Sequence, residues 1–446
     1  MALSGLQIQK LLPQTNCKEC GSNTCLAFAM KLAAKKADIK ECPYASDEAI
    51  HVLGLANEPP VKSVVLGPDK GLTAGGETVL YRHDKTFVNP TIMAININDT
   101  EAPAKVEQTL ASIRDYVLER VGESLTIGMV AITQLSEDAT AFRELASKAW
   151  KTTGKPLILR GKTVSAIQDA ASLIAGSHSI LCAPDALSAD TLAPFAKEQD
   201  HALALTAPDM DSLVELSSRH RDNGFHNLLL GWETYSLSEH LQTNTIARRS
   251  AIKDNFKPLG FPFVHFIDTG TLMDDTNAAV TDITKYGSIC VLPSFNAAQL
   301  ATLLTLRLNI YTDPQKPIQV EPKVYAIGEP TPDSPVFVTT NFSLTYFIVT
   351  GEIENSGISA WLVVPECEGM SVLTAWAAGK FSAAGIAKFI RETNLEQQVK
   401  TRRIIIPGYV AQISGELEDN LPGWQVMVGP EEASDLESFI KSCIVT

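Results

Sequence analysis

Short apolar runs alternate with amphipathic segments through the middle of the chain. Between about residues 61 and 318, eight strand-like runs are each followed by a segment whose apolar residues recur with helical spacing. The apolar runs cover residues 91–98, 125–133, 156–160, 179–183, 202–206, 227–232, 263–268 and 288–293. They are nearly continuous, as expected for parallel strands that are covered on both faces. Eight such units over about 230 residues predict an α/β protein with a central (β/α)8 TIM barrel, and a doubly wound sheet is the alternative.

The segments between these runs predict the helices of the barrel. They cover residues 102–121, 137–152, 164–175, 187–198, 210–221, 238–255, 275–286 and 297–308, and a β-hairpin at 63–66 and 78–82 precedes the first strand. Side chains at the carboxyl ends of barrel strands form the functional face in this architecture. The polar residues expected at that face are Asn96, Asn98, Asp185, Glu233 and Asp268.

The pattern after residue 335 predicts a second, smaller α/β fold. Strands are expected at 346–349, 360–364, 403–406 and 425–428, with helices at 373–377, 383–393, 413–418 and 432–442. This alternation is typical of a flavodoxin-like or Rossmann-like sheet. The Pro59-Pro60 pair and the proline-containing stretch 311–335 are predicted linkers. We therefore expect three domains, at residues 1–60, 61–318 and 319–446, and both end domains should move relative to the barrel.

Composition and charge narrow the classes of function. The chain has 446 residues, of which 45% are hydrophobic and 20% are charged, and this length exceeds that of an ordinary single domain. Its formal net charge of −14 argues against a nucleic-acid partner, because phosphate binding requires clustered lysine and arginine. No apolar run is long enough to span a membrane, and residues 1–10 lack the regions of a signal peptide. We expect a cytoplasmic protein without a membrane partner.

Four of the eight cysteines fall within the first 42 residues, at Cys17, Cys20, Cys25 and Cys42. Their spacing is C-x2-C-x4-C-x16-C, and a proline follows the last of them. A tight cysteine group in a long cytoplasmic chain indicates metal or redox chemistry before disulfides. Structural zinc sites usually pair two short knuckles, whereas three cysteines followed by a distant Cys-Pro are typical of an iron–sulfur cluster. We expect a [4Fe–4S] cluster, with zinc as the alternative, and a helix over 26–36 after Cys25.

The predicted C-terminal strands lead into turns that contain glycine, at Gly369, Gly408 and Gly429. Glycines at the carboxyl ends of such strands let the backbone approach a large planar ligand, although ordinary βα turns also require glycine and proline. All eight histidines lie at or before His265, so a corrinoid bound in this fold would have no local histidine ligand to cobalt. Loss of that ligand would ease reduction of the metal.

These residues resemble a known family over the whole chain. The resemblance rests on the segment N-C-K-E-C-G-S-N-T-C-L-A-F-A with Cys42-Pro43-Tyr44, on the central barrel, and on the stretch P-E-C-E-G-M-S-V-L-T-A-W-A-A-G-K. The chain is similar to the large (gamma) subunits of the corrinoid iron–sulfur proteins of the reductive acetyl-CoA pathway, and the cysteine segment is highly specific. The resemblance implies a small iron–sulfur domain, a TIM barrel and a flavodoxin-like or Rossmann-like corrinoid-binding domain.

The resemblance implies a methyl carrier. In this family, cobalt(I) of the corrinoid accepts a methyl group from methyltetrahydrofolate, presented by a separate methyltransferase, and delivers it to acetyl-CoA synthase. The [4Fe–4S] cluster passes one electron that returns cobalt(II) to cobalt(I). The implied partners are the small subunit, the methyltransferase, acetyl-CoA synthase and an electron donor or reductive activator. Whether the chain counts as an enzyme or as the carrier component of a methyltransferase system stays open.

The resemblance also assigns site residues. Cys17, Cys20, Cys25 and Cys42 would ligate the cluster. The corrinoid contacts would be Thr340, Tyr346, Gly369, Met370, Ser371, Val372, Leu373, Thr374, Gly429, Pro430 and Ala433. Thr374 would lie under the cobalt face and is the candidate catalytic residue, although threonine also suits an ordinary helix N-cap. Tyr346 could equally serve in core packing.

Two other functions stay open from the sequence. Asn96, Asn98 and Asp268 could bind a pterin directly, which would make the chain an independent barrel methyltransferase. Alternatively, the chain could be an iron–sulfur electron-transfer or scaffold protein without a corrinoid. A nucleotide in the C-terminal fold is disfavoured, because no G-x-G-x-x-G follows its strands and no P-loop is present. Direct tight binding of methyltetrahydrofolate by this chain alone would favour the first alternative.

Overall fold

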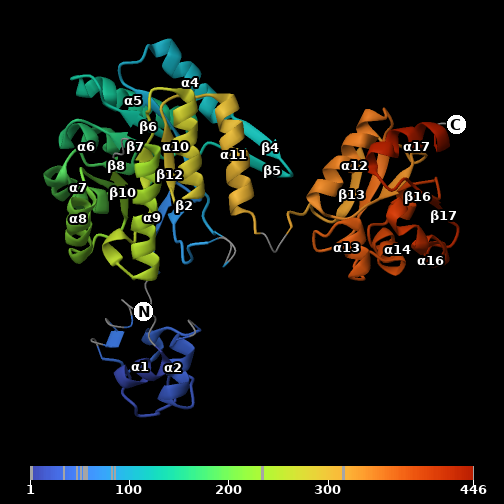
Figure 1. The fold of residues 1–446 in the computed structure, drawn as a ribbon, viewed down its shortest axis with the longest axis horizontal. Helices are drawn as coiled ribbons and strands as arrows, with labels where there is room; N and C mark the ends of the chain where they lie inside the picture. Colours follow the sequence, from blue (N-terminus) through green and yellow to red (C-terminus); the bar gives the residue numbers. More distant parts are fainter. Residues whose placement is uncertain are drawn as a thin grey trace. The chain divides into compact units, whose positions relative to one another are not determined.

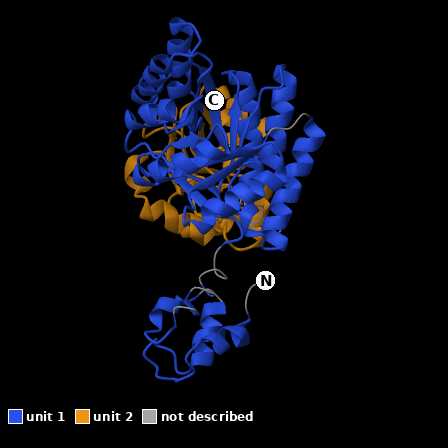
Figure 2. Ribbon diagram, turned by 90° about the vertical axis from the view of Figure 1, so that its left-hand side faces the viewer, with its two compact units in different colours: residues 1–117, 126–311 blue, residues 118–125, 312–446 orange. Residues whose placement is uncertain are grey.

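The computed structural model describes residues 4–33, 36–46, 49–50, 53, 59–81, 84, 87–232, 236–313 and 317–444. The chain divides into two compact units, coloured blue and orange in Figure 2. Unit 1 comprises residues 1–117 and 126–311, and unit 2 comprises residues 118–125 and 312–446. Unit 1 holds the cysteine-containing segment and the barrel, and unit 2 holds the C-terminal sheet. The expected division into three domains stays a prediction.

Unit 1 contains an eight-stranded parallel barrel (Figure 1). The strands neighbour one another in the order β10-β9-β8-β7-β6-β3-β12-β11. They are β3 Ile92–Asn98, β6 Met129–Thr133, β7 Leu157–Arg160, β8 Ile180–Cys182, β9 Ala202–Ala207, β10 Leu228–Trp232, β11 Val264–Phe266 and β12 Ile289–Leu292. The strands at the two ends of this order, β10 and β11, are linked by one parallel bridge between Leu230 and Phe263. The ring is therefore nearly closed. The predicted barrel is confirmed, and the doubly wound alternative for this region is wrong.

A helix follows every barrel strand and packs on the outside of the ring (Figure 1). The helices are α4 Pro103–Asp115, α5 Ala139–Thr153, α6 Val164–Ser172, α7 Ala186–Glu198, α8 Met210–Asp222, α9 Leu237–Lys253, α10 Leu272–Thr284 and α11 Ala297–Tyr311. Many start at a side chain that accepts a hydrogen bond from a backbone N–H of the first turn, as Asp185, Asp209 and Thr271 do. Each of these capping residues comes within a few residues of the end of a strand. The connections from strand to helix, at the carboxyl ends of the strands, are therefore short.

A hairpin fills the end of the barrel at which the strands begin. Its strands are β1 Ser63–Leu66 and β2 Leu72–Gly75. Val64, Leu66 and Ala74 share one buried cluster with apolar residues of the barrel interior. The backbone N–H of Gly67 donates to the carbonyl oxygen of His178, just before β8. The carboxyl ends of the strands are therefore the end of the barrel that remains for a functional face.

Two predictions for residues 61–126 are wrong, a range of which residues 118–125 belong to unit 2. The second strand of the first hairpin lies at Leu72–Gly75 and not at residues 78–82, of which residue 82 is outside the described part of the chain. The helix predicted over 102–121 ends at Asp115, and a second hairpin follows it. Its strands are β4 Val117–Arg120 and β5 Glu123–Thr126. The sequence did not reveal this hairpin, because its Val121-Gly122 turn lacks the Asn-Gly or Asp-Gly signal of such turns.

Unit 2 is built on a five-stranded sheet in the order β13-β15-β14-β16-β17. The strands are β13 Lys323–Ile327, β14 Val336–Val338, β15 Ala360–Val364, β16 Arg403–Ile406 and β17 Gln425–Val428. β13 is antiparallel to β15, and the other pairs are parallel. Counted along the chain from β14, the parallel strands have the order 2-1-3-4 that flavodoxin-like sheets show. The strand order reverses between β14 and β16.

Helices cover both faces of this sheet. They are α12 Ser343–Asn355, α13 Val372–Ala377, α14 Ala383–Glu392, α15 Leu395–Gln398, α16 Ser414–Asn420 and α17 Leu436–Cys443. Val336 and Val338 of β14 share a buried cluster with Ile386 of α14, whereas Phe337 shares another cluster with Ile353 of α12. Alternate residues of the strand thus face two different helical layers. This arrangement buries both faces of β14, as is usual for parallel strands.

Two predictions for unit 2 are wrong. Residues 346–349 are not a strand but lie in α12. Their β-branched and aromatic residues favour a strand locally, whereas the fold uses the segment to cover the sheet. The stretch 311–335 is more than a linker, because it contains β13. β14 went unpredicted, since three apolar residues between Pro335 and Thr339 are too few for a periodic signal.

The N-terminal segment of unit 1 consists of short helices around a small apolar cluster. They are α1 Gly5–Leu11, α2 Cys25–Ala33 and the 3₁₀ helix η1 Ile39–Glu41. Ile8, Phe28 and Leu32 lie at the centre of this cluster. α2 confirms the helix expected after Cys25, although residues 34 and 35 of the predicted range are outside the described residues. Among the described helices, none is long and apolar enough to cross a membrane.

The first hairpin should contribute strongly to the stability of unit 1. We expect Leu66→Ala to lower the free energy of unfolding by about 2–5 kcal/mol, because it removes a fully buried side chain from the barrel interior. Val65→Ala, on the opposite face of β1 with 42% exposure, should cost less than about 1 kcal/mol. Native-state hydrogen exchange in denaturant reports on the units separately. Equal effects of the two substitutions would contradict this packing.

Candidate functional site

The four predicted cluster ligands come from one short segment of unit 1. Cys17 and Cys20 lie in the loop after α1, Cys25 is the first residue of α2, and Cys42 follows η1. Cys25 and Cys42 are 8% and 7% exposed, whereas Cys17 and Cys20 are half-buried. Cys20, Cys25 and Cys42 all contact the same apolar cluster. None of the four forms a disulfide, so all are available as thiolate ligands.

The loop that carries Cys17 and Cys20 has an unusual backbone. The angle φ is 57° at Gln14, 49° at Asn16 and 69° at Lys18. Such left-handed residues are strained unless they are glycine or asparagine, and they cluster at sites where a ligand fixes the chain. The side-chain oxygen of Asn16 accepts a 2.8 Å hydrogen bond from the backbone N–H of Cys25. The sequence analysis did not single out Asn16. Its position directly before Cys17 was the signal that could have identified it.

The sulfur atoms of the four cysteines do not form a compact group in the structure. Tetrahedral zinc with bonds of about 2.3 Å would bring its sulfur ligands to about 3.8 Å from one another. These four cysteines lie within the described residues, and no three of them have sulfur atoms that all approach within 4.8 Å. Their side chains must therefore turn toward any metal or cluster that they ligate.

Unit 2 contains a cavity of about 270 Å³ at the carboxyl ends of β14, β16 and β17. It lies where the strand order reverses between β14 and β16, which is the position at which open α/β sheets bind ligands. Its walls are largely apolar and include Val338, Leu373 and Ile406. Thr339 and Ser371 contribute hydroxyl groups.

Six of the predicted cofactor contacts line this cavity, and five do not. The lining includes Ser371, Val372, Leu373, Gly429, Pro430 and Ala433. Outside it lie Thr340, Tyr346, Gly369, Met370 and Thr374. Thr340 is fully buried and directly follows Thr339, which does line the cavity. The ring of Tyr346 packs against that of Tyr325 at an angle of 51°, with centroids 4.6 Å apart, and burial raises the pKa of Tyr346 to about 12. That contact agrees with a role of Tyr346 in core packing.

Thr374, the candidate for the residue under the cobalt, is exposed in the first turn of α13. The N-cap of this helix is Ser371, so the alternative that Thr374 is the N-cap is wrong. The Ser371 hydroxyl makes no capping bond to the backbone and lies 3.0 Å from Oγ1 of Thr374. Ser371 therefore links the cavity lining to Thr374.

The groups around the cavity suit a large, partly apolar cofactor. The hydroxyls of Thr339, Thr340 and Ser343 are buried without a hydrogen-bond partner in the described part of the chain. Buried polar groups of this kind are rare in folded proteins unless a ligand or water satisfies them. Ile348 and Leu373 also line the cavity, yet they are 44% and 45% exposed. The cavity therefore opens through an apolar rim.

Sequence reasoning missed the lining that comes from α12 and from the turn after β16. Thr345 and Ile348 were assigned no role, because their helix was predicted as strand or left out. The Tyr409 hydroxyl donates to the carboxylate of Glu432, another lining residue, and this bond raises the pKa of Tyr409. Gly408 was the available signal, since a Cβ there would lie 2.7 Å from backbone atoms of the turn after β17.

The polar residues predicted at the barrel strand ends do not converge on one site. Asn96 donates to the side-chain oxygen of Asn98 at 2.9 Å and accepts from the hydroxyl of the last residue of β6 at 2.6 Å. Asp185 is the N-cap of α7, and Asp268 is exposed. Glu233 lies outside the described residues. The structure thus brings together only the two asparagines.

Two protein families match the chain. The family "CO dehydrogenase/acetyl-CoA synthase delta subunit" matches residues 63–440. The family "Putative Fe-S cluster" matches residues 12–44, a range that includes all four predicted cluster ligands. Dihydropteroate synthase (FolP) from Thermus thermophilus is a similar solved structure, with a TM-score of 0.39 and 11% identity over 56% of this chain and 100% of that chain. This last similarity is too low to carry an inference.

Relatives with known names match nearly the whole chain. It is 40% identical to the corrinoid/iron-sulfur protein large subunit of Moorella thermoacetica, over 99% of both chains. It is 32% identical to the acetyl-CoA decarbonylase/synthase complex subunit gamma of Methanocaldococcus jannaschii, over 99% of this chain and 96% of that protein. The same subunit of Methanothermobacter thermautotrophicus is 31% identical over 99% of both. The chain therefore belongs to the family of the corrinoid/iron–sulfur protein large subunits and the acetyl-CoA decarbonylase/synthase gamma subunits.

Proposed function

We propose that this chain is a corrinoid-dependent methyl carrier that also holds one [4Fe–4S] cluster. The observation that carries the proposal is the cavity at the strand-order reversal of unit 2. A relative that matches the chain over its whole length is named for a corrinoid and for iron–sulfur. In this proposal residues 1–60 hold the cluster, residues 61–318 form the barrel, and residues 319–446 hold the corrinoid.

Cys17, Cys20, Cys25 and Cys42 ligate the cluster in this proposal. Three cysteines followed by a distant Cys-Pro favour a cubane cluster. The burial of Cys25 and Cys42 protects one side of such a cluster from water, whereas the half-buried Cys17 and Cys20 leave an exposed side for electron transfer.

The corrinoid uses the cavity and its apolar rim. About 270 Å³ is below the ~300–1,000 Å³ of pockets that enclose a drug-sized ligand, so the cavity accepts one extension of the cofactor rather than its ring. Ile348 and Leu373, which form the rim, would offer apolar contacts to the ring. The unpartnered hydroxyl of Thr339, which lines the cavity, offers a hydrogen bond to a polar group of the cofactor. Because no histidine follows His265 in the chain, unit 2 has no imidazole for the cobalt, which favours a base-off corrinoid.

When bound, the corrinoid supplies a cobalt that carries a methyl group from methyltetrahydrofolate to acetyl-CoA synthase, and the cluster supplies the electron that restores its reduced state. The residues of unit 2 bind and orient the cofactor, and their apolar side chains exclude water from it. Ser371 holds the Thr374 hydroxyl at the edge of the cavity. The proposed partners are the small subunit, a separate methyltransferase, acetyl-CoA synthase and an electron donor or reductive activator.

Metal analysis of the anaerobically purified chain tests both cofactors at once. We expect about four irons with matching sulfide and about one cobalt per chain. Iron without cobalt, after growth with corrinoid available, would contradict the proposed corrinoid and would leave the proposed cluster standing. Zinc in place of the iron would contradict the cluster. Tight binding of methyltetrahydrofolate to this chain alone would instead favour a pterin-binding barrel.

The assignment of Cys42 can be tested against a cysteine that has no proposed role. Cys42→Ser removes one of four thiolate ligands and should lower the iron content at least about tenfold. Cys443→Ser changes an exposed free cysteine and should leave iron and sulfide at the level of the unmodified chain. An unchanged iron content in Cys42→Ser would exclude Cys42 as a ligand.

The cavity can be filled without touching the predicted cofactor contacts. Thr345→Trp places an indole in the cavity from α12 and should lower the cobalt content at least about fivefold while the iron content stays unchanged. Glu354→Trp adds the same group to an exposed position of the same helix and should retain cobalt. Full cobalt content in Thr345→Trp would show that the corrinoid does not use this cavity.

A further inference from the structure

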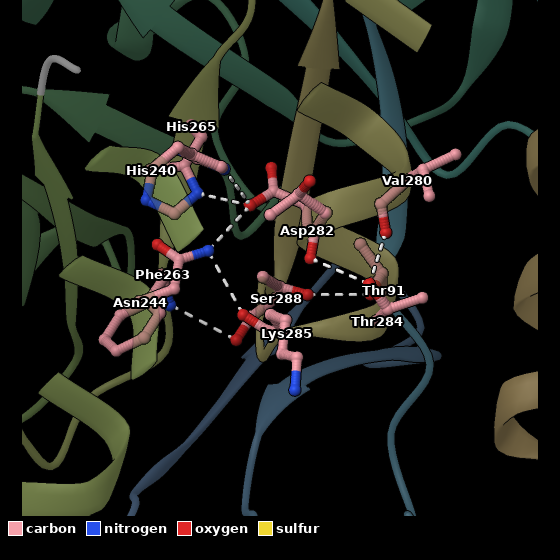
Figure 3. A network of polar contacts seen from close by, with 12 residues as sticks. Thr91, His240, Asn244, Phe263, His265, Val280, Asp282, Thr284, Lys285 and Ser288 are labelled. Carbon is pink, nitrogen blue, oxygen red and sulfur yellow. Dashed lines mark hydrogen bonds and ion pairs between the residues drawn. The ribbon is translucent and has the colours of Figure 1, made fainter. Parts of the chain in front are cut away.

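A group of buried polar side chains lies between the barrel strands and the outer helices, among residues that neither proposed cofactor site uses (Figure 3). His240 of α9, His265 of β11 and Asp282 of α10 place ligand atoms within 4.8 Å of one another. Their side chains are 7%, 3% and 0% exposed. Within the described residues, this is the single group of three or more potential metal ligands with that spacing.

One oxygen of Asp282 is the centre of the group. Nε2 of His240 and Nδ1 of His265 each lie 2.8 Å from Oδ1 of Asp282. Dashed lines in Figure 3 mark these contacts. Nδ2 of Asn244 donates to the same oxygen at 3.2 Å and to the carbonyl oxygen of Lys285 at 3.1 Å. Gly287 leaves room for the carboxylate, because a Cβ at that position would lie 2.5 Å from three atoms of Asp282.

The neighbouring strand adds a thiol. His265 and Cys290 are register partners on the parallel strands β11 and β12. Val264 and Ile289, which precede them, face the barrel interior, so His265 and Cys290 both face the outer helices. Cys290 is fully buried, and its sulfur lies outside the 4.8 Å group that His240, His265 and Asp282 form.

The hydrogen bonds do not satisfy every atom of the group. Oδ2 of Asp282 and Nε2 of His265 are buried and have no hydrogen-bond partner in the described part of the chain. A fully buried carboxylate requires a compensating positive charge nearby. One carboxylate and one thiolate together would balance the two charges of a divalent cation.

We propose that His240, His265, Asp282 and Cys290 form a structural Zn²⁺ site. Imidazole nitrogen, carboxylate oxygen and thiolate sulfur are all zinc ligands, and structural zinc sites are closed by four protein ligands in a tetrahedron. Binding releases the Cys290 proton to solvent and shifts each imidazole proton to the nitrogen that does not bind the metal, so no oxidant or reductant takes part. Asn244 stays outside the ligand set and orients the carboxylate.

For His240, His265 and Asp282, only a small movement separates hydrogen bonding from coordination. The Cys290 side chain must also turn toward the ion, because it lies outside their 4.8 Å group. Tetrahedral bonds of about 2.0–2.3 Å place ligand atoms about 3.3–3.8 Å apart. The histidine nitrogens lie 2.8 Å from Oδ1 of Asp282, so they need to retreat by about half an ångström. The ion would tie α9, which follows β10, to β11, α10 and β12. It would therefore reinforce the barrel beside the bridge between β10 and β11 that nearly closes the ring.

Zinc spectroscopy of the full chain with its cofactors tests the site. Protein produced in zinc-containing medium should hold about one zinc per chain, and absorption at the zinc K-edge should show one sulfur and three nitrogen or oxygen ligands. Iron and cobalt do not contribute at this edge. Zinc that had replaced the proposed cluster at the N-terminal cysteines would show four sulfur ligands, so the two locations give different results.

Two variants and a control locate the ion. Cys290→Ser and Asp282→Asn should each lower the zinc content at least about tenfold. Cys182→Ser, at another buried cysteine in a barrel strand, should retain the zinc. Cys290→Ser replaces only the sulfur atom of the side chain, so it decides the outcome if Asp282→Asn does not fold. Unmodified protein with less than about a tenth of a zinc per chain, or zinc that persists in Cys290→Ser, would overturn the proposal.

Discussion

Both faces of a parallel sheet must be buried by other parts of the protein, and this constraint determines where each unit can bind a ligand. In unit 1 the helices cover the outside of the ring, side chains fill its interior, and the β1–β2 hairpin fills the end at which the strands begin. In unit 2 helices cover both faces of the open sheet. The accessible positions are then the carboxyl ends of the strands. In unit 2 the reversal of strand order between β14 and β16 separates the connections on the two faces, and the cavity lies at that point.

The N-terminal segment depends on a different principle. Its apolar cluster is small, and the loop between α1 and α2 holds Gln14 and Lys18 in a left-handed conformation that costs free energy. A segment with so little buried surface generally requires a metal or disulfides to stay folded. The cysteines form no disulfide, so the proposed cluster would stabilise the segment as well as carry electrons. Its folding and its function then depend on the same four thiolates.

The buried polar groups of the barrel carry a free-energy cost that neighbouring groups must offset. A hydrophobic layer between strands and helices needs no ionised side chain, and each buried charge must be compensated. Asp282 lies in that layer with two histidines, an asparagine and Cys290 around it, and Gly287 leaves the space that its carboxylate occupies. These residues come from elements on both sides of the bridge between β10 and β11. The polar group therefore lies at the part of the ring with the least strand pairing.

The sequence by itself determined the features that depend on local patterns. Eight apolar runs with helical segments between them predicted the barrel, and the spacing of Cys17, Cys20, Cys25 and Cys42 predicted a cluster site. The tertiary structure decided whatever depends on contacts between distant segments. Residues 346–349 form part of α12 because the sheet requires cover, although their composition favours a strand. The cavity brings together residues that are far apart in the chain, and so does the contact between His240 and Asp282. The burial of the Thr339 and Thr340 hydroxyls without a partner also depends on such contacts. No periodicity records such contacts, because the chain topology creates them.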